Sequence, residues 1–549
     1  ADLRQPLLML WGAVGIVLLV ACVNLAGLLL ARASGRAREI ATRMALGSGR
    51  SAIVRQLLVE SVVLAMLGAA AGLALGHYAL AALQALADNV FELWQPASLD
   101  ARAVAVACAL ALVASVLFGL VPALHATRLD VQAAMAESGA RSVAGAANRW
   151  PRRVIVVAQV ALGVVLLVGA GLLFRTFSHL RHLEPGFDPN GVTTVSLSLQ
   201  DARYQTGERV VRIFDETLRR ISETAGVDSA AVALGVPYER LLNMGFRYLD
   251  GPLAGSPDGK ITNATYVSPD YFRALRIPLL AGRAFDQRDR KDSPGVVIVS
   301  HAFAQRYFDD GNAMGHRIRV MGMEREIVGV VGDVQVKPSW GDSEPLTAQP
   351  LAYMPATQVN DGTLKLIHGW FSPTFIVRAA GTTEATARTV RAALDASDPL
   401  LPIAEVRSMA EVQAASIAQQ RFLLVLLAVL AGATVLLGAI GIHGLIATSV
   451  TERTREMGIR IALGATRSRA LRTLAAPGIT LAAIGVVVGA GAALAAARLL
   501  RAFVFGVSTT DPLTFVAVSV VLLAVATVSS VVPALRVLRV QPSSALRAQ

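Results

Sequence analysis

REIATRMALGSGRSAIVRQL, residues 38–57, and REMGIRIALGATRSRALRTL, residues 455–474, are two copies of one basic, amphipathic segment. They align without a gap, and each copy stands between two long apolar runs. After a shorter connecting loop in the second copy, VPAL at 121–124 matches VPAL at 532–535. Both copies have the same order and orientation. The sequence therefore predicts a parallel duplication, which suggests a pseudo-two-fold axis along a membrane normal.

The apolar runs predict a membrane protein. Of the 549 residues, 54% are hydrophobic, which is too apolar for an ordinary soluble enzyme. Seven runs approach or exceed the roughly 20 residues that a helix needs to cross a bilayer. They lie near 7–31, 57–83, 103–124, 154–177, 422–448, 475–499 and 513–535. We expect about seven transmembrane helices, arranged as two three-helix repeats and one additional helix.

These runs also divide the chain into domains. We predict a first three-helix repeat at 1–150, a single span at 151–177, an extracytoplasmic domain at 178–420 and a second repeat at 421–549. The second repeat is preceded by its own span and external domain. By analogy, the duplication predicts a further span and external domain ahead of Ala1 in a longer chain.

The positive charge indicates the orientation of the chain. The net charge is +12, yet residues 178–420 hold 25 basic and 28 acidic side chains. The other segments hold 26 Arg, 20 of them at 32–55, 125–153, 450–472 and 536–549. Seven spans place all four of these segments on one side, which the positive-inside rule makes the cytoplasm. The excess of Arg is thus explained by topology, and we expect no nucleic-acid partner.

The large domain is expected to be α+β. GVTTVSLSL at 191–199 alternates as a strand, and 206–225 forms an amphipathic helix. Near its end, a strand at 373–379, a helix at 383–396 and a strand at 401–406 predict a βαβ-type layer. An inserted subdomain of short strands and turns is expected at about 230–370. It includes a strand followed by a helix at 295–308 and a hairpin at 316–334. Cys22 and Cys108 both lie in predicted spans, so no disulfide framework is expected there.

The second basic segment predicts a helical elbow. Its apolar residues alternate with Arg460 up to Gly464, which favours a short helix that ends at glycine. A second helix is expected to begin near Ser468 and to enter the membrane. Such an elbow could rest on anionic lipid headgroups. Alternatively, it could dock a cytoplasmic partner, and two equivalent elbows would suit a symmetric dimer.

The same residues resemble a known family. TREMGIRIALGATR at 454–467, DP at 511–512 and VPALRVLRVQPSSALR at 532–547 resemble the MacB/FtsX-like ABC transporter permeases. The stretches YVSPDYFRALRIPLLAGRAFDQRD (266–289), VVIVSHAFAQRYF (296–308), EIVGVVGDV (326–334) and FIVRA (375–379) are similar to the MacB-like periplasmic core domain. Two permease copies in one chain resemble the duplicated orphan permease type, here apparently without the first transmembrane helix and first periplasmic domain.

The resemblance implies a permease subunit of the bacterial inner membrane, with its large domain in the periplasm and its C-terminus in the cytoplasm. A separate cytoplasmic ABC ATPase dimer would drive it by mechanotransmission, in export or efflux, with a periplasmic adaptor or effector as a possible partner. The implied ATPase-docking residues are Arg38, Glu39, Arg43, Gly47, Arg455, Glu456, Arg460 and Gly464. The alternative is an FtsX-like transmembrane regulator of a periplasmic partner such as a cell-wall hydrolase.

Two further patterns bear on mechanism. Gly68 and Gly72 of the first copy match Gly485 and Gly489 of the second, a small-xxx-small spacing that allows close helix packing. Residues 408–420 run without Pro or Gly into the fifth span, which predicts one helix of about 40 residues. Likewise, 152–183 is expected to continue past the fourth span. Long helices of this kind could transmit displacement across the membrane.

Several kinds of chemistry are not expected. The chain has no Walker A motif and no H-E-x-x-H, so we predict no ATPase activity, no catalytic residues, no cofactor and no metal site. His179 and His182 are an isolated pair. The polar residues Asn24, Gln159 and His443 within the spans are expected to hydrogen-bond between helices. No carboxylate lies at mid-bilayer, which disfavours an ion-coupled carrier.

Overall fold

The computed structural model divides the chain into two compact units. One contains Ala1–Ser178 and Gln419–Gln549, and the other contains His179–Ala418. The structure describes residues 4–35, 43, 48–87, 98–127, 150–204, 206–250, 254, 259–309, 311–338, 345–462, 466–501 and 503–537. Each unit has its own buried apolar clusters, so each is considered by itself.

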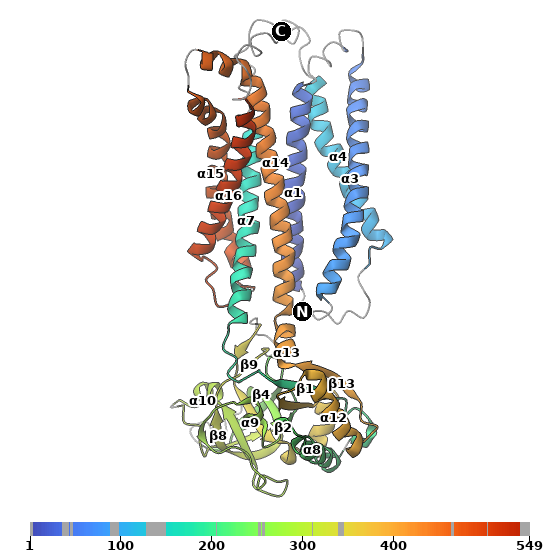
Figure 1. The fold of residues 1–549 in the computed structure, drawn as a ribbon, viewed down its shortest axis with the longest axis vertical. Helices are drawn as coiled ribbons and strands as arrows, with labels where there is room; N and C mark the ends of the chain where they lie inside the picture. The colour runs from blue at the N-terminus through green and yellow to red at the C-terminus, as the bar shows by residue number, and fades with distance from the viewer. Residues whose placement is uncertain are drawn as a thin grey trace. The chain divides into compact units, whose positions relative to one another are not determined.

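The first unit is built from long helices (Figure 1). They are α1 (Arg4–Gly35), α3 (Arg50–Ala87), α4 (Ala101–Thr127), α7 (Trp150–Arg181), α14 (Ala418–Ala462), α15 (Arg467–Leu500) and α16 (Pro512–Val537). All but α4 contain a stretch long and apolar enough to cross a membrane, by length and composition. The described apolar part of α4 is shorter, Ala101–Val116, although the whole helix has 27 residues. Every predicted span therefore lies in a helix.

Helix α14 differs from the prediction at both ends. The expected continuation from residue 408 is wrong, because α13 (Met409–Ser416) ends before α14 begins at Ala418. Neither Pro nor Gly causes this break. Instead, the hydroxyl of Ser416 donates to the carbonyl oxygen of Gln413 at 2.6 Å, which competes with continuation of the helix. In contrast, α7 has 32 residues and extends past its apolar run as expected.

At its other end α14 continues into the basic segment, and its last turns bend away from the axis of its long part (Figure 1). Its 45 residues run through the apolar span Ala418–Gly444 and on through the basic segment to Ala462. The predicted short helix is therefore joined to the span without a break in helical structure, and its described part ends at Ala462, close to the predicted stop at Gly464. The one glycine after the span, Gly458, costs a helix only about 1 kcal/mol, which is too little to end it. The second helix of the segment, α15, begins at Arg467 as predicted.

The second unit contains a four-stranded layer. Its strands β1 (Val192–Leu197), β2 (Val227–Ala233), β12 (Thr374–Ala379) and β13 (Ile403–Ser408) lie in the order β2-β12-β1-β13. The helices α8 (Gly207–Ser222) and α12 (Thr383–Ser397) connect β1 to β2 and β12 to β13, and they pack on the layer. Strand β1 is antiparallel to both β12 and β13, so these two are parallel to each other. The arrangement is a split βαβ of ferredoxin-like type.

The segment between β2 and β12 forms a closed ring of six strands. The ring contains β3 (Leu242–Tyr248), β4 (Lys260–Val267), β6 (Val296–Ser300), β7 (Arg317–Val320), β8 (Met323–Val331) and β11 (Leu351–Pro355). Their order is β11-β6-β8-β7-β3-β4, and a parallel pairing of β11 with β4 closes it. The short strand β5 (Leu279–Gly282) pairs with β8, and β9 (Gln335–Val336) pairs with β10 (Thr347–Ala348). This six-stranded barrel accounts for the predicted insertion.

Local sequence explains the predicted strand–helix unit and hairpin in this barrel. Strand β6 leads into α10 (His301–Tyr307), whose N-cap Ser300 accepts from the Phe303 amide. The hairpin β7–β8 turns through Met321 and Gly322, both with positive φ. Such φ values are typical of a two-residue type I′ turn. The helices α9 (Tyr271–Leu275) and α11 (Asp361–His368) follow β4 and β11.

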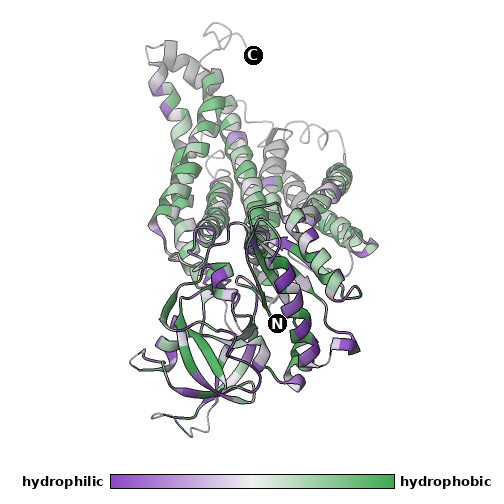
Figure 2. Cartoon of the chain, turned by 60° about the horizontal axis from the view of Figure 1, so that its bottom comes forward, coloured by the Kyte–Doolittle hydropathy of each residue, from purple (hydrophilic) through white to green (hydrophobic). Residues whose placement is uncertain are grey.

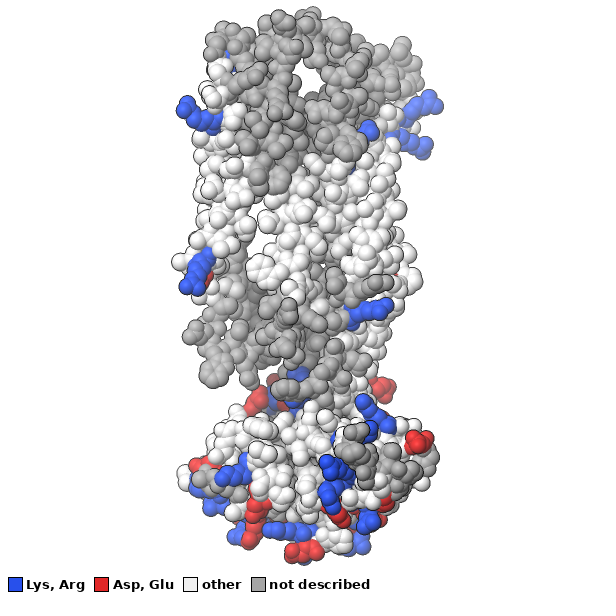
Figure 3. Space-filling model, turned by 180° about the vertical axis from the view of Figure 1, so that it is seen from behind, with Lys and Arg blue, Asp and Glu red and all other residues white. Residues whose placement is uncertain are grey.

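The two units differ in surface chemistry. Figure 2 shows the helices of the first unit hydrophobic along most of their length, whereas the second unit mixes hydrophobic strands with hydrophilic helix faces. In Figure 3, Lys, Arg, Asp and Glu are spread over the second unit and are sparse on the described surface of the helices. These distributions are those expected of a membrane-spanning and a water-exposed part.

Candidate functional sites

The predicted docking segments are described only in part. Arg455, Glu456 and Arg460 lie in the last turns of α14, and their side chains are outside the described part of the chain. Arg38, Glu39, Gly47 and Gly464 also lie outside the described residues. In the first copy, Arg43 donates from Nη1 to Oε1 of Gln56 on α3 at 3.1 Å. Gln56 in turn donates to Glu60 at 3.3 Å, so Arg43 is linked to the start of α3.

The continuity of α14 gives this segment a mechanical connection. At 1.5 Å per residue, the length of α14 measured along its axis is about 68 Å, more than the roughly 30 Å of a hydrocarbon core. The 18 residues after Gly444 would make about 27 Å of this length. One continuous helix thus contains both an apolar span and the residues to which docking is assigned.

Helix α7 is the most buried of the spans. In an 18-residue apolar stretch of this span, 56% of the residues are buried, against 28% or less in the corresponding stretches of the other five candidate spans. A Cβ added at Gly485 of α15 would lie 2.7 Å from Cβ of Val160 on α7. At Gly489 it would lie 2.7 Å from the carbonyl oxygen of Ala161. The structure therefore packs this pair of glycines directly against α7.

The matching glycines of the first copy have different surroundings. A Cβ built at Gly68 or Gly72 of α3 would meet no heavy atom of the described residues within 4 Å. The same sequence spacing thus marks a tight helix contact in one copy and an open helix face in the other.

An ion pair joins α7 to the start of α16. Arg175 lies 2.5 Å from Oδ1 of Asp511, and Asp511 also caps α16 by accepting from the amide and hydroxyl of Thr514. The bond from Arg175, with those from Thr514, lowers the pKa of Asp511 to about 2. In the first copy, the matching Asp100 caps α4 by accepting from the amide of Ala103 at 2.8 Å. Both copies therefore use the aspartate as a helix cap.

Asn24 and Gln159, two polar residues of the spans, lie where α1, α7 and α14 meet. Asn24 of α1 donates from Nδ2 to the carbonyl oxygen of Leu437 on α14 at 2.7 Å, an interhelical bond of the predicted kind. A Cβ at Gly441 of α14 would lie 2.8 Å from Oδ1 of Asn24 and 2.6 Å from Oε1 of Gln159 on α7. Both amide atoms of Gln159 are buried without a hydrogen-bond partner among the described residues. Glycine is therefore the residue that leaves room for these amides.

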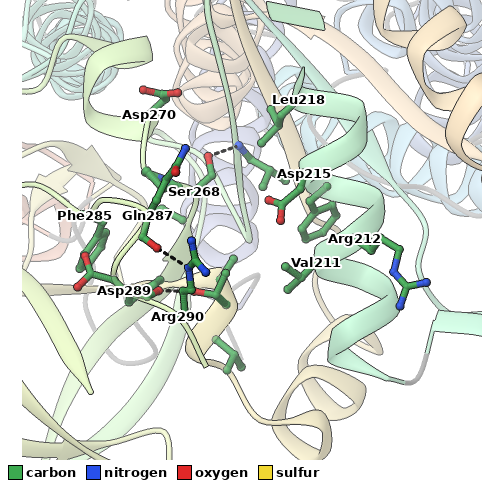
Figure 4. A pocket seen from close by; sticks show the side chains of 18 of the residues that line it. Val211, Arg212, Asp215, Leu218, Ser268, Asp270, Phe285, Gln287, Asp289 and Arg290 are labelled. Carbon is green, nitrogen blue, oxygen red and sulfur yellow. Dashed lines mark hydrogen bonds between the residues drawn. The ribbon is translucent and has the colours of Figure 1, made fainter. Parts of the chain in front are cut away.

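The second unit has a cleft of about 1090 Å³ between α8 and the loops that follow β4, β5 and β11. In Figure 4, Val211, Asp215 and Leu218 of α8 lie on one side, and Gln287, Asp289 and Arg290 lie on the other. The cavity is at the upper end of typical small-molecule sites. The sequence analysis missed this site, because its walls come from segments about 50–150 residues apart and no local pattern marks them.

Metal chemistry has no candidate here. Within the described ranges, no group of three or more His, Cys, Asp or Glu side chains could hold a metal ion.

Comparison with protein families identifies both parts of the chain. The MacB-like periplasmic core domain matches residues 154–396. The FtsX-like permease C-terminal domain matches twice, at 11–131 and 428–542. The two matches coincide with the two copies of the duplication.

ABC transporter permeases are among the individual proteins that this chain resembles. The chain is 29% identical over 303 residues to an uncharacterized ABC transporter permease, YvrN, of Bacillus subtilis, covering 52% of this chain and 71% of that protein. It is 27% identical over 244 residues to the macrolide export ATP-binding/permease protein MacB of Azoarcus, covering 44% and 36%. The chain thus spans little more than a third of that MacB. The periplasmic region of MacB from Actinobacillus actinomycetemcomitans matches 41% of this chain and 92% of its own, at 13% identity and a TM-score of 0.28.

Proposed function

The chain belongs to the MacB/FtsX-like ABC transporter permeases, and from this premise we propose that it is a membrane subunit driven by a separate cytoplasmic ATPase dimer. ATP hydrolysis by that dimer moves the external unit by mechanotransmission, and the direction of transport is export. The protein resides in the bacterial inner membrane, with residues 178–420 in the periplasm and the C-terminus in the cytoplasm. The chain itself hydrolyses no ATP.

The observation that carries this proposal is that α14 is one continuous helix containing both an apolar span and the basic segment. A conventional carrier needs a polar site at mid-membrane, whereas a mechanical coupler needs a stiff element that reaches from the ATPase through the bilayer. Helix α14 has this length, and it includes Arg455, Glu456 and Arg460 in its last turns. A force applied there would act on the same helix that crosses the membrane.

The export direction is supported by relatives alone. The matched proteins include macrolide and pyoverdine export ATP-binding/permease proteins. Within the described spans, an amide cluster is the main polar feature, which gives a polar substrate little to bind inside the bilayer.

The test is retention of the ATPase. The tagged chain is purified from native membranes in mild detergent, and P-loop ATPases that remain bound are quantified by mass spectrometry. The double substitution E456Q/R460Q is expected to lower retention by about tenfold or more, since the two lost charged contacts together are worth about 1.4 kcal/mol or more. R501Q, in the loop predicted to lie on the opposite side, is the matched control. Equal retention by both variants would remove the docking role.

A further inference from the structure

Most charged side chains around the cleft of the second unit are paired with a neighbour of opposite charge. The pairs are Glu208–Arg212, Glu216–Arg220, Arg219–Glu223, Asp270–Arg273, Asp286–Arg288 and Asp289–Arg283. Asp361 accepts from the backbone amide of Gly207 at 2.9 Å. These groups are therefore satisfied without a ligand.

Three charged side chains that line the cleft have no partner of opposite charge among the described residues. Among the residues that the structure describes, no ion pair reaches Asp215, Arg290 or Lys291. Arg290 donates from Nε only to the neutral carbonyl oxygen of Gln287, at 2.8 Å. Asp215 has no hydrogen bond within the same ranges, because Arg212 and Arg219 on its helix bind Glu208 and Glu223.

The surroundings of Asp215 disfavour its charge. Water reaches the carboxylate, yet the protein packed around the cleft raises its pKa by desolvation. No nearby cation offsets this desolvation. A cationic group brought into the cleft would supply the missing partner.

The unpaired charges lie on opposite walls. Asp215 projects from α8 toward the gap, and Arg290 lies on the loop across it, whereas Arg212 turns away from the gap (Figure 4). Val211 and Leu218, both partly exposed, stand on α8 on either side of Asp215 and also line the cleft. The α8 wall of the cleft thus combines apolar side chains with one negative group, and the facing loop carries positive groups.

We propose that this cleft binds a short zwitterionic molecule with an apolar body, as a small peptide is. Its ammonium group binds Asp215, its carboxylate binds Arg290 and Lys291, and its apolar side chains pack on Val211 and Leu218. A simple amine would leave the two cations unpaired, and a simple acid would leave Asp215 unpaired. The dipolar ligand satisfies both walls at once. Binding at this site does not depend on the proposed coupling to an ATPase.

Three matched peptides test this proposal. The full chain in lipid nanodiscs, without nucleotide or ATPase, is titrated calorimetrically with trileucine, N-acetyl-trileucine and trileucine amide. Empty nanodiscs give the lipid background. Trileucine is expected to bind saturably, and each cap is expected to weaken binding about tenfold, since each removes one charge pair.

Variants assign each end of the ligand. D215N is expected to weaken trileucine about tenfold and to leave N-acetyl-trileucine unchanged. The double variant R290Q/K291Q is expected to do the same with trileucine amide as its insensitive ligand. D270N removes a paired charge from the same cleft and should leave all three affinities within about twofold.

Two outcomes of these titrations would contradict the proposal. The proposal is overturned if capped peptides bind the unmodified chain as well as trileucine does. It is also overturned if no peptide binds above the empty-nanodisc background. These comparisons on the unmodified protein stand even where a variant fails to fold.

Discussion

Exchanging glycine for alanine should change stability in opposite directions in the two copies. In the pair G485A/G489A, each new methyl group meets α7 at once, 2.7 Å from Cβ of Val160 and 2.7 Å from the carbonyl oxygen of Ala161. Carbon atoms pack best at about 3.5–4.0 Å, so α15 must move away from α7 by roughly 1 Å. Overpacking of this kind costs about 1–3 kcal/mol per site.

The matched pair G68A/G72A lacks this cost. No described heavy atom lies within 4 Å of either new methyl group. Alanine is favoured over glycine in a helix interior by up to about 1 kcal/mol per residue. The first-copy variant should therefore be as stable as the unmodified chain or slightly more stable. The second-copy variant should lose up to about 4 kcal/mol, because overpacking at two sites costs about 2–6 kcal/mol and the helix preference of two alanines offsets about 2 kcal/mol of it.

The assay is reversible unfolding of the full chain in mixed micelles, with rising SDS and helical circular dichroism as the signal. The midpoint should fall for G485A/G489A and stay or rise for G68A/G72A. Equal losses in both variants would refute the reasoning, because they would show that helix packing around the two glycine pairs is the same. A gain for G485A/G489A would refute the α7 contact itself.

Three other predictions follow from named contacts. The pKa of Asp511 is lowered to about 2, so its ion pair stabilises the protein above the ordinary carboxyl pKa near 4, and this stabilisation is lost as pH falls through about 2. D511N should therefore flatten the acid-unfolding curve between these pH values. Arg378 is 4% exposed and donates to the carbonyl oxygens of Ala274, Asn190 and Asp188. R378L should therefore lower the free energy of unfolding of the second unit, measured in urea, by about 3–5 kcal/mol. The exposed control R212L should lower it by about 0.5 kcal/mol. A447P removes a backbone hydrogen bond within α14, at a cost of about 3 kcal/mol. It should abolish the stimulation of ATP hydrolysis in the partner ATPase while retention of that ATPase stays normal, whereas A447L should preserve both. Normal stimulation in A447P would contradict the mechanical role of α14.

Sequence alone determined the spans, the duplication and the layer formed by β1, β12 and β13. These features are local: an apolar run long enough to cross a bilayer leaves little alternative to a helix, and alternating residues at 191–199 favour a strand. The family was also evident from the basic segments and the 266–289 stretch. The position of the turn at Met321 and Gly322 fits the predicted hairpin for the same local reason.

The closure of the barrel, the cleft beside Asp215 and the length of α14 were decided by the tertiary structure. Strand β11 pairs with β4 across about 90 residues, and the cleft depends on that closure, so neither has a local sequence signature. The break at Ile417 depends on one side-chain hydrogen bond, and the glycine pairs differ only in their neighbours. A residue's type sets which contacts it can make, but the contacts that it does make depend on which distant segments lie against it.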